Sequence, residues 1–130
     1  MALTHVTAIR TILADTVVDA IDAGSADPNG DMQIATGSSF ALILALLQFS
    51  NPAFGSAVSG LATANAIAPD TNAPATGTAT YFRVRDCDNA EIFRGTVTIT
   101  GGGGDMQLSS TNIVAGDTVT INSMTYIAAL

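Results

Sequence analysis

The stretch from residue 77 to residue 100 constrains the fold more than any other part of the chain. Its apolar positions are Phe82, Val84, Phe93, Val97 and Ile99, and its polar positions are Tyr81, Arg83, Arg85, Arg94, Thr96 and Thr98. The two kinds alternate on both sides of Asp86-Cys87-Asp88-Asn89, a sequence that suits a tight turn. Because successive side chains of a strand point to opposite faces, this pattern predicts an antiparallel hairpin with one buried face and one solvated face.

The solvated face of this hairpin carries most of the positive charge of the chain. Three of the four basic residues, Arg83, Arg85 and Arg94, lie on it. They form either a recognition patch or a set of charges neutralised by the acidic residues Asp86, Asp88 and Glu91 of the same hairpin. A net charge of −7 favours neutralisation, by these residues or by an acidic neighbouring subunit.

Residues 5–22 predict the only convincing helix, since their apolar residues recur at spacings of three and four. This stripe consists of Val6, Ile9, Leu13, Val17, Ala20 and Ile21. Thr4 is the expected N-cap and Gly24 the expected stop. We expect the stripe to face the sheet or a neighbouring subunit, while the aspartates of another face stay solvated. Those aspartates are Asp15, Asp19 and Asp22.

With the hairpin included, the chain is predicted to contain six to eight short strands. The candidate segments include residues 31–37, 40–49, 57–68, 105–114 and 118–121, with a turn or bulge at 122–123 and a glycine loop at 101–104. The apolar run 40–49 indicates a strand buried on both faces, although a short buried helix has the same pattern. We therefore predict an α+β fold in a single domain, 1–130. An N-terminal amphipathic helix (5–22) packs on an antiparallel β-sandwich (about 31–128) of the jelly-roll or immunoglobulin-like kind.

Composition narrows the function classes. The chain has 130 residues, no lysine, a net charge of −7 and a pI near 4.1, which argue against binding to nucleic acid or to an anionic membrane surface. Only 12% of residues are charged, against about 25% in typical proteins. With a mean hydropathy of +0.41, such a surface suits burial in an assembly or, equally, a monomer rich in small residues. The longest apolar run, residues 40–49, is too short to span a bilayer.

No catalytic, cofactor-binding or metal-binding residue is predicted, and no cofactor is expected. His5 is the only histidine and stands without a nucleophile at a suitable spacing, so we expect no enzyme activity. Two acidic turns resemble calcium ligand sets, but ordinary turn chemistry explains them better. Their residues are Asp27, Asn29 and Asp31 in one turn, and Asp86, Asp88, Asn89 and Glu91 in the other.

The single cysteine, Cys87, has no partner for an internal disulfide. It lies at the predicted hairpin turn, where it is either a passive thiol or the site of an intermolecular disulfide. The N-terminal residues 1–10 lack the basic region and apolar core of a signal peptide, so we expect the chain to assemble in the cytoplasm where it is made.

Four blocks of this sequence resemble a family of small proteins encoded among the structural genes of tailed bacteriophages and prophages. They are THVTAIRTILADTVVDAIDAGS, FSNPAFGSAVSGLATANAI, ATGTATYFRVRDCDNAEIFRGTV and DMQLSSTNIVAGDTVTINSMTYI, in the order expected for the family. The chain departs from the family at Ser38-Ser39, where a longer glycine-rich loop is usual, and at Cys87-Asp88-Asn89. The family has no catalytic residues to transfer.

This resemblance implies a non-enzymatic virion structural protein that works in the virion after assembly in the host cytoplasm. A capsid decoration or cement protein is the expected role, and a neck, collar or tail component is the alternative. The expected partners are copies of the chain itself and the major capsid protein or other virion proteins, not nucleic acid or a membrane. A receptor- or glycan-binding module is a further alternative, although the chain has no Trp and only two Tyr.

Overall fold

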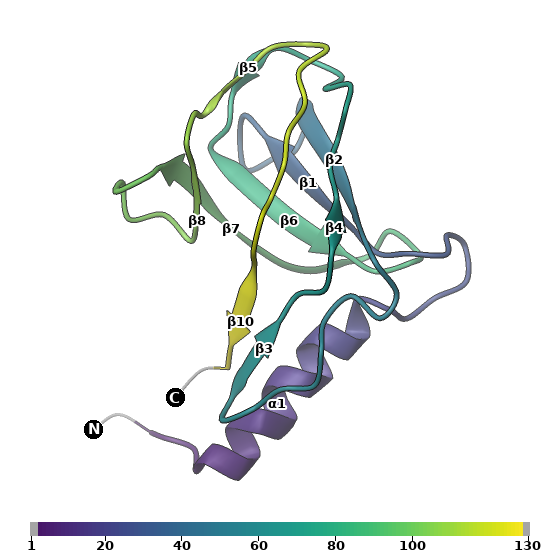
Figure 1. Ribbon diagram of the computed structural model, residues 1–130, viewed down its shortest axis with the longest axis vertical. Coiled ribbons are helices and arrows are strands. Elements are labelled where there is room, and N and C mark those ends of the chain that lie inside the picture. Colours follow the sequence, from purple (N-terminus) through teal and green to yellow (C-terminus); the bar gives the residue numbers. More distant parts are fainter. Residues whose placement is uncertain (1–2, 129–130) are drawn as a thin grey trace.

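The computed structural model describes residues 3–128, which form one helix followed by a series of short strands (Figure 1). The helix is α1 (Thr7–Ala20). The strands are β1 (Asp31–Ala35), β2 (Ile43–Phe49), β3 (Leu61–Thr63), β4 (Ile67–Ala68), β5 (Gly77–Thr78), β6 (Tyr81–Arg85), β7 (Glu91–Ile99), β8 (Met106–Leu108), β9 (Asn112–Ile113) and β10 (Thr125–Ile127). The fold is therefore α+β and mainly β, as predicted.

A six-stranded sheet in the order β4-β2-β1-β6-β7-β8 forms the largest unit. Its neighbours are antiparallel except β7 and β8, which run parallel. Two small sheets, β10-β3 and β5-β9, contribute Ala62 of β3 and Ile113 of β9 to the same hydrophobic core. Helix α1 contacts β3 and β10 rather than the six-stranded sheet, so the helix lies beyond one end of the sheet (Figure 1).

The hairpin predicted at residues 77–100 is confirmed as β6 and β7. Phe82 and Val84 are buried, and the intervening arginines lie on the other face. Phe93 is opposite Val84 in the register and meets Phe82 edge to face, with ring centroids 6.5 Å apart. Ile99 was predicted to lie on the buried face, and this prediction is wrong because Ile99 is exposed. At this end β7 extends beyond β6 and pairs only with the short edge strand β8.

Of the predicted run 40–49, residues 43–49 are confirmed as a strand, β2, but this strand is not buried on both faces. Leu44, Leu47 and Phe49 are in the core, while Leu42 and Leu46 are exposed. The segment is central in the sheet, yet only one of its faces is covered by the small sheets and the chain segments between them. An open second face explains why a nearly continuous apolar run still alternates in burial.

Several predicted strands are shorter than expected. Residues 57–68 contain β3 and β4 with a break between them, and residues 105–114 contain β8 and β9. Residues 118–121 form no strand; Val119 makes a single antiparallel bridge to Asp70. Residues 122–123, expected to form a turn or bulge, form neither a turn nor a strand before β10. The glycine loop at 101–104 is confirmed, with Gly101 and Gly103 at φ of 89° and 82°.

The helix prediction is right in position, but only part of the predicted apolar stripe packs on the domain. The residues that α1 buries are Ala14 and Val18, and Ile21 is buried just beyond its end. Val6, Ile9 and Leu13, expected to face the sheet or a neighbouring subunit, are all exposed in the isolated chain, and Val17 of the same stripe is half-buried. The N-cap is Val6, without a side-chain cap, instead of Thr4, and the helix ends at Ala20, before Gly24.

Candidate functional sites: a helix face and an open cleft

Helix α1 is attached to the domain by hydrogen-bond acceptors on its inner face. Thr11 Oγ1 accepts from the Gly60 N–H (3.0 Å), Asp15 Oδ1 from the Ala57 N–H (2.7 Å), and Asp22 Oδ1, just beyond the helix, from the Ala53 N–H (2.9 Å). All three donors lie in the loop between β2 and β3. The expectation that Asp15 and Asp22 stay solvated is therefore wrong, since both are half-buried acceptors.

Burial raises the pKa of the Asp22 carboxyl, although its bond from the Ala53 N–H acts in the opposite direction and nearby Asp19 adds to the increase. Asp19 itself is exposed, as predicted. The inner face thus combines small apolar residues with carboxylates that complete the hydrogen bonding of a loop. Backbone N–H groups in such a loop require partners.

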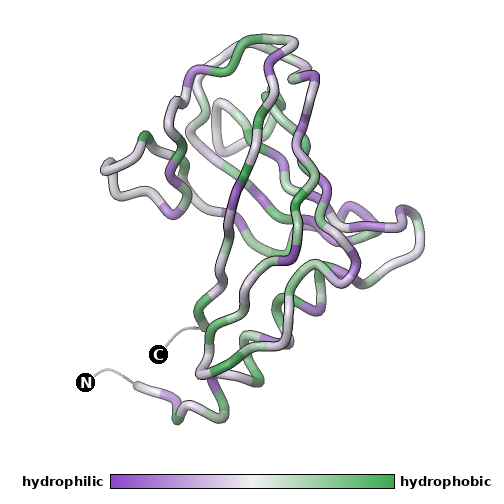
Figure 2. Tube along the Cα trace, viewed as in Figure 1, coloured by the Kyte–Doolittle hydropathy of each residue, from purple (hydrophilic) through white to green (hydrophobic). Residues whose placement is uncertain are grey.

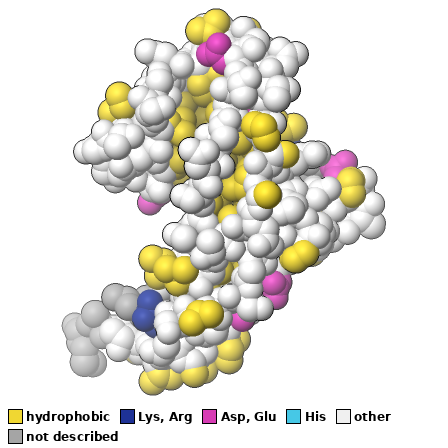
Figure 3. All heavy atoms as spheres, in the orientation of Figure 1, with side chains coloured by type: hydrophobic (Ala, Val, Ile, Leu, Met, Phe, Trp, Pro, Cys, Tyr) yellow, Lys and Arg dark blue, Asp and Glu magenta, His cyan; other side chains and the backbone are white. Residues whose placement is uncertain are grey.

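The apolar stripe of the helix lies on the side opposite this attachment. Leu3, Val6, Ile12 and Leu13 are 82%, 69%, 59% and 38% exposed, and Ile9 is also exposed. At 100° per residue, Ile9 and Leu13 lie nearly opposite Val18 and Thr11. We call Val6, Ile9 and Leu13, with Leu3 and Ile12 at their margin, the helix face. Figure 3 shows hydrophobic side chains gathered over the end of the molecule where α1 lies.

The arginines of the hairpin are neutralised within the chain. Glu91 accepts two hydrogen bonds from Arg94, at 3.0 and 2.7 Å, and lies 3.8 Å from Arg83. These bonds hold the pKa of Glu91 below its usual range. Both guanidinium groups also lie over the ring of Phe40, at 4.5 and 5.1 Å from its centroid. Phe40 has a φ of 54°, rare for a residue with a Cβ, and its ring occupies the space between the arginines and the sheet.

Arg85 has a separate partner, Asp31 on the adjacent strand β1. The two side chains form a bidentate pair at 2.8 and 2.7 Å and are nearly buried. Local neutralisation is confirmed for the three arginines, with Glu91 as the predicted partner of two of them. Asp31 could not be identified from the sequence as the partner of Arg85, because the residue opposite Asp31 in the sheet depends on the order of the strands and not on distance along the sequence.

The two acidic turns lie side by side (Figure 2) and are joined by hydrogen bonds. Asp88 Oδ1 accepts from the N–H groups of Ser25 and Ala26, both at 2.9 Å, which lowers the pKa of Asp88. Asp27 accepts from the Asn89 side chain at 3.1 Å. Within residues 3–128 no group of three or more His, Cys, Asp or Glu side chains is placed to hold a metal ion.

Cys87 is buried beneath these turns, with Sγ 3.8 Å from the Ile21 carbonyl oxygen. Burial, followed by the surrounding carboxylates, raises the pKa of its thiol. The passive-thiol interpretation fits this position, since a buried thiol cannot reach another subunit. His5 lies exposed in the segment before α1.

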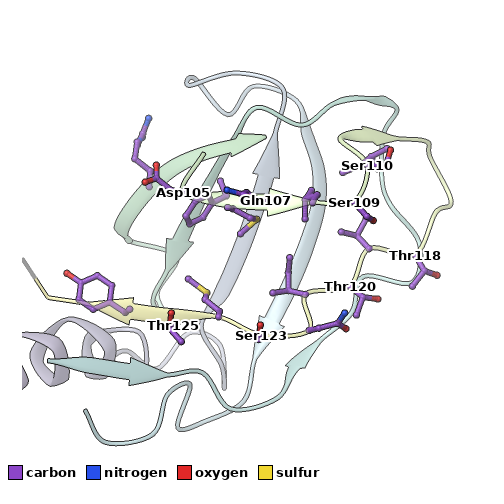
Figure 4. Close-up of a pocket in the computed structure, with 18 of the residues that line it drawn as sticks. Asp105, Gln107, Ser109, Ser110, Thr118, Thr120, Ser123 and Thr125 are labelled. Atoms are coloured by element: carbon purple, nitrogen blue, oxygen red, sulfur yellow. The ribbon is translucent and has the colours of Figure 1, made fainter. Parts of the chain in front are cut away.

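A cleft of about 910 Å³ opens between β8 and residues 117–127. Its floor is apolar and includes Phe82, Phe93, Met106, Ile121 and Met124. Its rim is polar: Gln107, Ser109 and Ser110 project from one side and Thr118, Thr120 and Ser123 from the other (Figure 4). Hydrophobic atoms are visible inside the cleft in Figure 3. Sequence reasoning missed this site, although the alternation in both of its walls was visible.

Comparison with protein-family models, with curated proteins and with solved structures gives no match to this chain. Within residues 3–128, no helix has both the length and the apolar character needed to cross a membrane.

Proposed function

We propose that this chain is a non-enzymatic structural protein of a bacteriophage virion, most simply a capsid decoration or cement protein. The exposed helix face is the observation that carries the proposal. An apolar stripe that the chain places outside its own core needs another surface to cover it. The resemblance of four sequence blocks to phage structural proteins supplies the biological setting.

The helix face has the composition of an interface core. Val6, Ile9 and Leu13 form a stripe without any charged side chain, and charged residues are depleted at the centres of protein interfaces. Burial of such apolar surface contributes about 25 cal/mol per Å². The contact that buries it joins copies of this chain to each other or to another virion protein. Closed rotational symmetry is the usual result when copies associate.

The attachment of the helix supports the same function. Thr11, Asp15 and Asp22 hold the helix to the loop between β2 and β3, so the apolar side chains are presented on a fixed support. A rigidly presented surface loses little conformational entropy on assembly. The protein thus acts by packing between neighbouring subunits, and no reaction is part of its role.

A double variant tests the proposal. Wild-type protein is expected to oligomerise, or to bind purified emptied heads of the virus that encodes it, and to raise their resistance to heat. Val6→Gln with Ile9→Gln is expected to abolish both effects while the domain stays folded. Val58→Gln, which alters an equally exposed valine outside the helix face, is the matched control and is expected to behave as wild type.

Binding to tails instead of heads would assign the chain to the neck, collar or tail. A monomer that binds neither heads nor tails would refute the structural function. Light scattering coupled to size-exclusion chromatography and sedimentation with particles distinguish these outcomes.

A further inference from the structure

The cleft between β8 and residues 117–127 lies between the unpaired edge of strand β8 and a facing segment, residues 118–121, that makes only one β-bridge. We propose that it binds an extended segment of a different polypeptide, which adds as a strand between these edges and places alternate apolar side chains on the cleft floor. This inference goes beyond the proposed function and does not depend on it.

The first edge is that of β8, the last strand of the six-stranded sheet. The Leu108 carbonyl accepts a hydrogen bond from the Thr100 N–H, at the end of β7. Because the backbone groups of successive residues in a strand point to opposite sides, the N–H and C=O of Gln107 point away from β7 and toward the cleft. Within residues 3–128, no strand pairs with that side of β8.

The second edge is formed by the segment before β10. Val119 uses both its N–H and its C=O in bonds to Asp70, on the side away from β8. The backbone groups of Thr118 and Thr120 therefore point toward the cleft. Neither of their N–H groups has a hydrogen-bond acceptor in the part of the chain that the structure describes.

β8 is short, with three residues, but neither edge carries the charges, prolines or bulges by which proteins prevent strand pairing. Natural edge strands are protected by charged side chains, proline or bulges. Residues 106–110 read Met-Gln-Leu-Ser-Ser and residues 118–124 read Thr-Val-Thr-Ile-Asn-Ser-Met, without a charge or a proline. Two unprotected edges across an apolar floor are the arrangement used when a peptide is bound by strand addition.

The burial pattern of the walls defines the side chains of the ligand. Met106 and Leu108 are half-buried and alternate with the exposed Gln107 on one wall, and Val119 and Ile121 alternate with the exposed Thr120 on the other. A strand between them continues this alternation, so every second residue of the ligand is apolar and its intervening residues face solvent. Asp105 and Asp117 at the ends of the cleft, on a chain of net charge −7, favour a neutral or basic segment.

The segment before α1 of a second copy is a poor donor of such a strand. Its described extended residues before α1 expose Leu3 and Val6, which are three positions apart. In a strand these two side chains point to opposite faces, so only one of them can reach the floor. The acidic net charge of a second copy also repels it from a cleft flanked by aspartates. Charge therefore favours a different polypeptide, neutral or basic, as the partner.

The test uses a synthetic peptide in which valine and threonine alternate between lysine ends. We expect it to bind and to slow hydrogen exchange at the amides of Gln107, Thr118 and Thr120. The control peptide has the same side chains with every second backbone nitrogen methylated, which removes the main-chain hydrogen bonds. It is expected to bind at least about tenfold more weakly.

Two protein variants complete the test. Thr120→Pro removes an N–H that points into the cleft and is expected to weaken peptide binding, whereas Thr120→Val keeps that N–H and is expected to bind as wild type. Thermal unfolding checks that both variants remain folded. If Thr120→Pro does not fold, the affinities of the wild-type protein for the two peptides still show whether main-chain hydrogen bonds contribute to binding.

Three results would overturn the proposal: no binding at up to about 1 mM peptide, equal affinity for the methylated peptide, or protection confined to residues outside the cleft. Protection of the cleft amides by a second copy at high protein concentration would replace the different polypeptide by self-association. None of these results alters particle binding through the helix face, so failure here and failure of the virion function are separable.

Discussion

The β6–β7 hairpin and helix α1 are held in the molecule by different interactions. The hairpin is fixed by apolar side chains, with Phe82 and Val84 in the core and Phe93 packed against Phe82. The helix segment is fixed by three buried apolar residues, Ala14, Val18 and Ile21, together with polar side chains that accept hydrogen bonds from the loop between β2 and β3. In the hairpin most apolar side chains pack in the core of the domain. In the helix most apolar side chains are exposed, so a second protein can cover them.

This difference shows that an amphipathic pattern identifies a surface to be covered but not the body that covers it. A strand in the middle of a sheet pairs with neighbouring strands on both sides. Contacts within the same domain therefore determine which of its side chains are buried. A helix at the end of a domain can turn either side inward. Here the inward side consists of small residues and acceptors, which match a loop whose N–H groups need partners.

The sharpest contrast comes from truncating a hairpin core residue. Phe82→Ala is expected to lower the free energy of unfolding by about 3–5 kcal/mol, because it removes a buried ring and leaves a cavity. Urea denaturation monitored by circular dichroism measures the loss. Ile99→Ala, on the exposed part of the same hairpin, is the control and is expected to change stability by less than about 0.5 kcal/mol. Equal effects would mean that the hairpin is not the centre of the core.

A polar variant tests how the helix is attached. Asp15→Ala is expected to cost about 1–3 kcal/mol, since the Ala57 N–H loses its acceptor in a partly buried place. Asp19→Ala removes an exposed aspartate of the same helix and is expected to cost less than about 0.5 kcal/mol. If the two variants are equally stable, the hydrogen bond to Ala57 does not hold the helix.

An apolar variant of the helix face is expected to have a smaller effect on the isolated chain. Leu13→Ala should lower monomer stability by less than about 1 kcal/mol, against about 2–5 kcal/mol for a leucine in a packed core. Ile21→Ala, at the buried end of the helix segment, is expected to fall in the larger range. A large cost for Leu13→Ala in a verified monomer would contradict the exposed position of the helix face.

The pH dependence of stability separates the same two regions. The pKa values of Asp88 and Glu91, beside the hairpin turn, are lowered by hydrogen bonds, as is that of Asp105 by the Thr96 N–H. Their contributions to stability are complete above the unfolded pKa values of about 4 and are lost as the pH falls through the lower folded values. We therefore expect the protein to lose stability in acid below about pH 4.

Asp22 beside the helix acts in the opposite direction, because burial raises its pKa. The folded state takes up a proton on Asp22 more readily than the unfolded state, so this group adds stability as the pH falls. Asp22→Asn keeps an oxygen to accept from the Ala53 N–H and removes the titration. We expect it to be at least as stable as wild type at pH 7 and to lose stability more steeply in acid. Chemical denaturation at a series of pH values measures both, and an unchanged slope would contradict the raised pKa.

Strands were predictable from the sequence where apolar and polar residues alternate along a segment and residues typical of turns follow that segment. Asp86 to Asn89 specify the hairpin turn, and Asn89 has the φ of 65° that asparagine tolerates. Residues 118–121 alternate just as well but form no ladder, because their outer edge faces the open cleft. The pairing of Asp31 with Arg85 was not predictable from sequence distance, since it depends on β1 lying beside β6.

The order of turns and alternating segments, the acidic and weakly charged character of the chain and the burial of Phe82 and Val84 follow from the sequence by itself. These depend on local geometry, on the pleat of a strand and on composition. Tertiary structure alone decided which side of α1 turns inward, which carboxylate meets Arg85, and that β8 and residues 117–127 remain apart. Each of these depends on contacts between residues distant in the sequence. The backbone N–H groups of a loop, or the hydrogen-bonding edge of a strand, determine which distant residues make those contacts.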